Sequence, residues 1–271
     1  MRCALQLSLT ATLLAFAWRC DAQLPIPPGG YDGFLFKGSR SSEVQLELFF
    51  DLMCPYCKLA WPNLKQVMNN YTDAQLAVVM HTFPLPYHHN AFYTAQGAHY
   101  LAQNSTRGRI DTVVMEYTEL VFKYQEEFND AETEKLSPAD VKQTLGSLVQ
   151  DNMGIASGPF VSGIQSGGEA DGSTRTSWKF ACGARAVSGT PSFMVNGVTV
   201  EAETSWTLDQ WKSLIDPLLS GPTTSASSPS KSTQHARVSC PPDTTECEYL
   251  PGKIDCCSGG DYCIPNVGCR C

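Results

Sequence analysis

Positive charge is scarce in this sequence of 271 residues: 19 Lys and Arg residues stand against 27 Asp and Glu residues, giving a formal net charge of -8. The basic residues are scattered, whereas binding to nucleic-acid phosphates requires clusters of them. Long apolar runs are also lacking after residue 22, so no later segment is expected to span a membrane. These absences exclude nucleic acid as a partner and predict no membrane span.

The first 22 residues, MRCALQLSLTATLLAFAWRCDA, have the features of a secretory signal peptide. Arg2 supplies a positive start, an apolar run extends from Ala4 to Trp18, and the small-residue cleavage site CDA follows. This run is shorter than the roughly 20 residues that a membrane anchor needs. Because the chain ends in CRC and not in a K-D-E-L-type retrieval signal, we expect secretion, with the lumen of the endoplasmic reticulum as the alternative. N-glycosylation sequons at 70–72 and 104–106 fit a glycoprotein on this route.

Cysteine is rare in the middle of the sequence, where only Cys182 lies between Cys57 and Cys240. Removal of the signal peptide leaves ten of the 12 cysteines, and seven of these are in the last 32 residues. The segment before them is dominated by Ser, Thr and Pro and has no apolar periodicity. We predict a signal peptide at 1–22, a domain at 23–219, a linker at 220–239 and a cystine-rich module at 240–271.

The predicted domain alternates strand-like and helix-like patterns, which is typical of an α/β fold. One helix is expected to begin at Pro138, with Ser137 as its N-cap. The predicted elements are a strand at 43–50, a helix that starts at the Cys pair and contains Pro62, a strand at 74–83, helices within about 90–185, a hairpin at 191–202 that turns at Asn196-Gly197, and a helix at 207–219.

Cys54 and Cys57 follow the first predicted strand directly, in the run DLMCPYCKLA. Cys54 is therefore at a strand-to-helix junction, where backbone N–H groups and the positive end of the helix dipole stabilise a thiolate. That thiolate can attack a disulfide, and Cys57, one turn later, can resolve the mixed disulfide that forms. Pro55 suits the first helical turn. We predict a redox pair that needs no cofactor beyond its own disulfide.

A Cys-x-x-Cys pair can also bind zinc or form a purely structural disulfide. A zinc site needs a second pair of ligands, and the spacing of the candidates matches no familiar ligand pattern; these candidates are His81, His88, His89 and Cys182. A purely structural disulfide that closes so short a loop contributes little stability. Redox function is therefore favoured, and no metal is expected.

Three motifs occur in the order LFFDLMCPYCKLAWPNL, FPLPYHHNAFYTAQGAHYL and GTPSFMVNG, with a helical block before the third. Together they resemble the DsbA-like branch of the thioredoxin superfamily over about residues 40–219. The resemblance implies a thioredoxin fold with a helical subdomain inserted at about 90–185. It also implies a nucleophilic Cys54, a resolving Cys57 and a cis Pro191 next to the pair.

The same resemblance suggests where a substrate would bind. A cis bond before Pro191 would offer the backbone of Thr190 to an extended chain. Pro55 and Tyr56 are similar to the corresponding dipeptide of glutaredoxins, so glutathione is considered as a co-substrate. We expect Thr190, Pro191, Pro55 and Tyr56 to contact substrates, which would be proteins or peptides that contain cysteine.

The sequence departs from the superfamily pattern at Leu48, because many of these enzymes carry a buried acid six residues before the first cysteine. Glu47 should face the other side of the sheet. Asp51 resembles the F-x-D-x-x-C-P-x-C form of the family, and it can serve either in proton transfer or as a helix-start residue that binds the loop. His88 and His89 are expected to be ordinary loop residues, and His81 to end a buried strand.

The cystine-rich module is too short for a hydrophobic core and should be held by disulfides. The adjacent Cys256 and Cys257 resemble knottin-like modules, whereas Cys271 is one cysteine more than that pattern has. Cys182 is either an apolar thiol or the partner of the odd tail cysteine. The module is interpreted either as a stabilised tail or as a docking unit for a surface or a protein.

Two functions are consistent with these observations. The first is a secretory thiol-disulfide oxidoreductase that works through Cys54 and Cys57, with the oxidase or isomerase direction favoured. The alternative is a secreted binding or effector protein, in which the thioredoxin-like domain is an inert scaffold and residues 240–271 carry the activity. Deletion of residues 240–271 would distinguish them, because it should spare dithiol exchange in the first case and abolish the biological effect in the second.

Overall fold

The computed structural model describes residues 32–104 and 110–219, and in the C-terminal part residues 244–250, 253–258, 262–264 and 268–270. The expected signal peptide, the expected linker and the last two residues of the second sequon lie outside the described residues. Tertiary contacts divide the chain into two units, residues 1–221 and 222–271.

The first unit contains every predicted strand and helix, together with shorter elements that the patterns did not predict. In chain order these are β1 (Phe34–Lys37), β2 (Val44–Phe50), α1 (Pro55–Asn70), β3 (Leu76–Thr82), α2 (Ala91–Asn104), α3 (Ile110–Lys123), η2 (Gln125–Phe128), α4 (Asp130–Thr133), α5 (Pro138–Met153), α6 (Ser157–Gly163), α7 (Glu169–Lys179), η3 (Phe180–Ala184), β4 (Ser192–Val195), β5 (Val198–Val200), α8 (Leu208–Ile215) and η4 (Asp216–Leu218).

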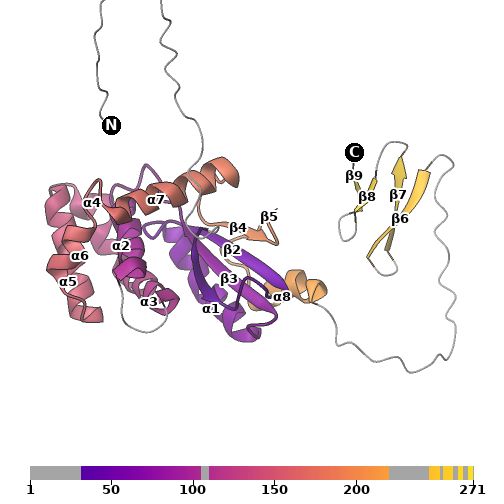
Figure 1. Cartoon of the computed structure of the whole chain (residues 1–271), viewed down its shortest axis with the longest axis horizontal. Coiled ribbons are helices and arrows are strands. Elements are labelled where there is room, and N and C mark those ends of the chain that lie inside the picture. The colour runs from indigo at the N-terminus through magenta and orange to yellow at the C-terminus, as the bar shows by residue number, and fades with distance from the viewer. Residues whose placement is uncertain are drawn as a thin grey trace, which may run out of the picture. The chain divides into compact units, whose positions relative to one another are not determined.

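A five-stranded sheet in the order β1-β3-β2-β4-β5 runs through this unit (Figure 1). β2 and β3 are parallel, and the other neighbours are antiparallel. The two parallel strands are central and largely buried, as their nearly continuous apolar runs predict. β1 was not predicted, because four residues are too few to display a strand periodicity.

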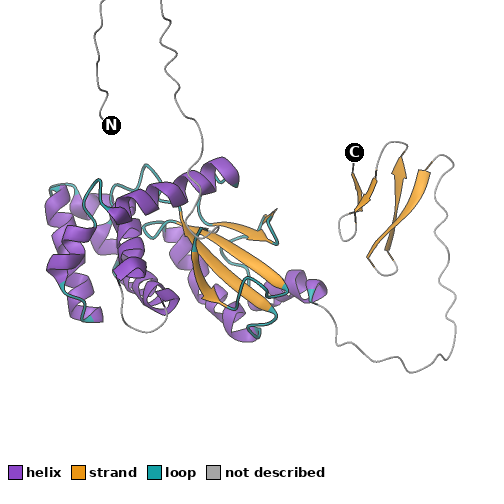
Figure 2. Ribbon diagram, viewed as in Figure 1, coloured by secondary structure: helices purple, strands orange, loops and turns teal. Residues whose placement is uncertain are grey.

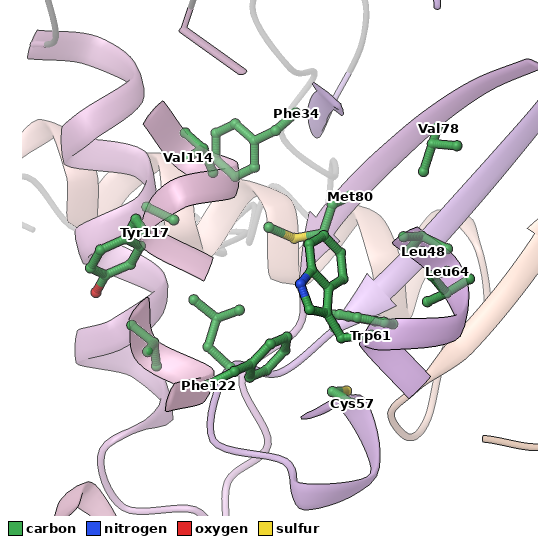
Figure 3. Packing of buried hydrophobic residues seen from close by; sticks show 14 of the residues in the cluster. Phe34, Leu48, Cys57, Trp61, Leu64, Val78, Met80, Val114, Tyr117 and Phe122 are labelled. Carbon is green, nitrogen blue, oxygen red and sulfur yellow. The ribbon is translucent and has the colours of Figure 1, made fainter. Parts of the chain in front are cut away.

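Helices cover both faces of the sheet (Figure 2). α1 and α8 pack together on one face, and α7 contacts β3 on the other. Side chains of β2 alternate accordingly, so that Leu48 and Phe50 belong to the larger core cluster and Phe49 to a smaller one. The helical insertion shares the larger cluster: Trp61 of α1 lies 6.0 Å from Phe122 of α3, ring centroid to ring centroid. Figure 3 shows Cys57 in the same cluster.

The helix and turn signals in the sequence are confirmed. α5 begins at Pro138 with a capping box between Ser137 and Asp140, and α8 has the equivalent pair Thr207 and Gln210. The β4–β5 hairpin turns at Asn196-Gly197, where both residues have positive φ, as a type I′ turn requires.

A network of charged side chains is buried on the face covered by α7 and η3. His81 Nδ1 lies 2.7 Å from Asp32 Oδ2, and His81 Nε2 lies 3.3 Å from Glu47 Oε2. Arg185 also pairs with Glu47, at 3.1 Å, and Ser177 donates a hydrogen bond to Asp32. His81 is thus a buried strand residue and Glu47 points away from the main core, both as expected.

The described residues of the second unit form two antiparallel pairs of strands, β6 (Thr244–Leu250) with β7 (Lys253–Ser258), and β8 (Tyr262–Ile264) with β9 (Gly268–Arg270). Cys247 is buried and disulfide-bonded. In the part of the chain that the structure describes, no helix has both the length and the apolar character to cross a membrane.

Candidate active site

Cys54 is the N-cap residue of α1, and Cys57 lies in the first turn of that helix. β2 ends at Phe50, and the turn that follows is closed by a hydrogen bond of 3.0 Å from the backbone N–H of Cys54 to the carbonyl of Asp51. Pro55 occupies the first helical turn, where a missing N–H costs nothing. Both thiols are free, with exposed fractions of 2% for Cys54 and 0% for Cys57. The predicted strand-to-helix junction is confirmed.

The two thiols differ strongly in acidity. The pKa of Cys54 is lowered to about 6, chiefly by a hydrogen bond from the Cys57 thiol, and further by the Thr190 hydroxyl and the backbone N–H groups at the start of α1. Burial raises the pKa of Cys57 well above its usual value, and the neighbouring Cys54 adds to this effect. These shifts favour a thiolate at Cys54 and a protonated thiol at Cys57 near neutral pH. The helix N–H groups contribute as predicted, but the Cys57 thiol contributes more.

Thr190 and Pro191 lie next to this pair, and the peptide bond between them is cis. When Cys54 is protonated, its thiol donates a hydrogen bond to the carbonyl oxygen of Thr190, with the sulfur 3.4 Å from that oxygen. β4 brings them there, because Ser192, its first residue, pairs with Phe49 near the end of β2. Sheet register thus places a segment 136 residues away in sequence beside the pair.

Tyr56 lies at the exposed rim of the site. Its side chain is 60% exposed, and Leu59 beside it on α1 is 61% exposed. Pro55 is exposed as well. Large apolar side chains in water next to reactive sulfurs are suited to contact with a substrate chain.

Asp51 connects the loop after β2 with the loop after β3. Its Oδ1 accepts a hydrogen bond of 2.8 Å from the backbone N–H of Met53, and its Oδ2 accepts one of 3.1 Å from that of Leu85. The imidazole of His88 lies against the same Oδ2, with Nδ1 at 2.6 Å. The interpretation of Asp51 as a residue that binds the loop is therefore confirmed, and its role in proton transfer stays a prediction.

His88 is a loop residue at the entry to the helical insertion, as expected, but its contacts there were not predicted. It contacts the buried Asp51 and lines one hollow together with Met53 and Pro55. A signal was present in the sequence: the loops that follow two parallel neighbouring strands meet at the same edge of the sheet. The loop carrying His88 follows β3, and the loop carrying Cys54 follows β2.

Gln125 of η2 is a second residue that the sequence did not indicate. Its side-chain amide donates hydrogen bonds to the carbonyl oxygens of Leu52 (2.8 Å) and Cys54 (3.1 Å). It thereby fastens the helical insertion to the loop that carries Cys54. No local pattern identifies a glutamine that acts at a separation of 71 residues.

The other candidates are not part of this site. His81 belongs to the buried charge network, and His89 is exposed near Asp130. Cys182 lies in η3 as a half-buried free thiol, with its sulfur 3.7 Å from the carbonyl of Lys179, and is not joined to the tail. Among the described residues, no group of three His, Cys, Asp or Glu side chains is placed to hold a metal ion.

A mixed sheet covered on both faces, a helical insertion after β3 and a Cys-x-x-Cys pair that faces a cis-proline define a protein of the thioredoxin fold. The chain belongs to the thioredoxin family, because the family model described as thioredoxin matches residues 33–217. A search of the curated proteins finds no match to this chain.

Three solved structures share this fold. A putative protein-disulfide isomerase from Pseudomonas syringae has 17% sequence identity and a TM-score of 0.56, and the match covers 66% of this chain and 96% of that one. The α-DsbA1 of Wolbachia pipientis has 18% identity and a TM-score of 0.52, with 72% and 92% covered. Oxidised BdbD from Bacillus subtilis has 16% identity and a TM-score of 0.53, with 70% and 94% covered. The expected fold, a thioredoxin fold with an inserted helical subdomain, is confirmed.

Proposed function

We propose that this protein is a thiol-disulfide oxidoreductase of the secretory route, which exchanges disulfides with cysteine-containing protein substrates through Cys54 and Cys57. The opposed acidities of the two thiols carry this proposal: the pKa of Cys54 is about 6, and that of Cys57 is well above its usual value. A purely structural disulfide gains nothing from a difference in acidity between its two cysteines, whereas disulfide exchange depends on one. The names of two structural neighbours, a putative protein-disulfide isomerase and a DsbA protein, agree with it.

In the oxidising direction, a substrate thiolate attacks Cys54 Sγ, and the Cys54–Cys57 bond breaks. Cys57 leaves with the electron pair and takes up a proton. A second substrate thiolate then attacks the substrate sulfur of the mixed disulfide, and Cys54 leaves as a thiolate. The substrate loses two electrons and the pair gains them. A low pKa makes Cys54 a good leaving group and stabilises the reduced pair, which favours the oxidase or isomerase direction.

Two groups complete the proposed cycle. The charge of Asp51 acts on Cys57, and we assign to Asp51 the transfer of the Cys57 proton. Reoxidation of the pair requires an external disulfide, for which glutathione disulfide is the proposed co-substrate.

The substrate chain is proposed to bind across the exposed start of α1 and the cis-proline segment. Pro55 and Tyr56 offer apolar surface, and Thr190 and Pro191 offer backbone beside the Cys54 sulfur. Residues 240–271 are proposed to act as a docking unit, which raises the effective concentration of the enzyme near a partner.

The experiment compares full-length Cys54→Ser with full-length Cys182→Ser in the refolding of a reduced, disulfide-containing protein. We expect Cys54→Ser to lose all exchange and to keep the native circular dichroism spectrum, whereas Cys182→Ser keeps its activity. Undiminished turnover in Cys54→Ser would refute the proposal. Deletion of residues 240–271 should leave disulfide exchange unchanged. If the tail carried the activity, this deletion would abolish it.

The redox potential of the Cys54–Cys57 pair gives an independent test. After equilibration with glutathione buffers, a potential of about -120 to -230 mV is expected for a working oxidase or isomerase. A value below about -300 mV would identify a structural disulfide.

A further inference from the structure

The contacts of His88 fix its ring at the edge of the redox site. Its Nδ1 lies 2.6 Å from Asp51 Oδ2, and its backbone N–H donates to the carbonyl of Leu85, whose own N–H donates to the same carboxylate oxygen. Its carbonyl accepts from Ala91 at the start of α2. The loop that carries the His88 ring is therefore fixed by hydrogen bonds on both sides of His88, to Leu85 and to Ala91. The ring lies beside Asp51, three residues before Cys54.

The burial of Asp51 explains why an imidazole is there. Only 1% of Asp51 is exposed, and a buried carboxylate is costly unless a cation or several hydrogen bonds compensate it. Two backbone N–H groups and His88 are its hydrogen-bond partners. A protonated His88 thus balances a negative charge that would otherwise oppose a thiolate at Cys54.

Other charges face His88 from each neighbouring element. The hollow on one side includes Glu126 of η2 and Asp130 of α4, and both are negative. The groove on the other side includes Arg175 and Lys179 of α7. Arg175 forms two hydrogen bonds with Asp171 in its own helix, at 2.8 and 3.2 Å, so that much of its charge is already balanced.

The acidity of His88 is coupled to Cys54. The hydrogen bond to Asp51 raises the pKa of His88 above its ordinary value of 6.5, and the negative charge of a Cys54 thiolate acts in the same direction. Coupling of this kind is reciprocal, so the imidazolium must stabilise the thiolate to the same extent. Formation of the Cys54–Cys57 disulfide removes the negative charge of Cys54, so the pKa of His88 should fall when the pair is oxidised.

We propose that His88 is a positioning residue of the redox site: paired with Asp51, its imidazolium holds Cys54 in the thiolate form, and it binds or releases a proton as the pair is reduced or oxidised. The proposal rests on the proposed function and adds the group that couples the redox state to pH. Because His88 takes up a proton when the pair is reduced, a fall in pH favours the reduced form and makes the Cys54–Cys57 disulfide a stronger oxidant.

The test uses the full-length protein with His88→Gln, which keeps a donor to Asp51 and removes the charge. The matched control is His89→Gln, the exposed neighbour, whose side chain is 71% accessible. The readout is the rate at which iodoacetamide alkylates Cys54, followed by mass spectrometry from pH 4 to 9. We expect the apparent pKa of Cys54 to rise by about one unit in His88→Gln. Alkylation at pH 6 then falls about fivefold, because the thiolate fraction drops from about one half to about one tenth.

His88→Arg separates charge from packing, since it restores a cation and cannot titrate in this range. It should recover rapid alkylation at pH 6. Equal pH profiles for His88→Gln and His89→Gln, or a His88→Arg profile no better than that of His88→Gln, would overturn the proposal. These profiles need no substrate, so they are independent of whether Cys54→Ser abolishes exchange.

The unmodified protein provides a second test that does not depend on the folding of a variant. The His88 ring protons, assigned by through-bond and through-space correlations in the unmodified protein, can be titrated by NMR in its reduced and oxidised forms. We expect a higher His88 pKa in the reduced form. Identical values in the two forms would overturn the proposal as well.

Discussion

Replacement of His81 by glutamine should destabilise the first unit strongly, because it removes the cation from a buried charge network. Asp32 and Glu47 would keep their carboxylates, with the Ser177 hydroxyl still donating to Asp32 and Arg185 still paired with Glu47. Removal of one partner from a buried ion pair costs about 3–5 kcal/mol. The ring also stacks on Phe49, with centroids 4.6 Å apart, so some packing energy is lost too. We expect a loss of about 3–5 kcal/mol in the free energy of unfolding.

The cost should depend on pH in a defined way. Burial alone would raise the pKa values of Asp32 and Glu47, but their pairing with His81 lowers both below the ordinary 3.8 and 4.5. The two carboxylates therefore contribute to the free energy of unfolding above those pKa values, and this contribution is lost in acid. Burial alone would lower the pKa of His81, but the two carboxylates raise it above 6.5, so its contribution is complete below 6.5 and is lost as pH rises through the folded-state pKa. The variant should differ most from the wild type between about pH 5 and 6.5.

Urea unfolding followed by tryptophan fluorescence measures this cost. Outside the expected signal peptide, the tryptophans are Trp61, Trp178, Trp206 and Trp211, all within 23–219, so the signal reports on this unit alone. His89→Gln is the control and should change the free energy of unfolding by no more than about 0.5 kcal/mol. A loss below about 1 kcal/mol for His81→Gln at pH 6, or one that grows steadily towards pH 9, would refute the reasoning.

Three further changes test the site. Cys57→Ala removes the largest cause of the low pKa of Cys54 and should raise it by about one to two units in the alkylation profile; an unshifted profile would show that the Cys57 thiol does not stabilise the thiolate. Thr190→Val keeps the shape of the side chain and removes its hydroxyl, so the alkylation profile should show a rise of about half a unit in the pKa of Cys54. A rise as large as that in Cys57→Ala would show that Cys57 is not the larger cause of the low pKa. Gln125→Leu leaves the buried carbonyls of Leu52 and Cys54 without their side-chain donor and should cost about 2 kcal/mol in urea unfolding, whereas unchanged stability would show that water replaces the amide.

Local patterns were sufficient for the elements with strong periodicity or a complete cap. The buried strands β2 and β3, the Ser137 and Thr207 capping boxes and the hairpin turn at Asn196-Gly197 all depend on residues within a few positions of one another. The position of Cys54 at a helix start follows from the same short-range signals. The short β1 and the small helices escaped prediction because each gains its stability from long-range pairing and packing.

The sequence alone was enough to find the Cys54–Cys57 pair, its helix-start setting and its place in a thioredoxin-like fold, because the Cys-x-x-Cys motif lies in four adjacent residues. It did not show that His88 pairs with Asp51, that Gln125 holds the nucleophile's loop, or that His81 joins two carboxylates under the sheet. Those contacts connect residues that are 34 to 73 positions apart. Electrostatic and hydrogen-bond partners at such separations are selected by strand register and helix packing, which no short window of sequence contains.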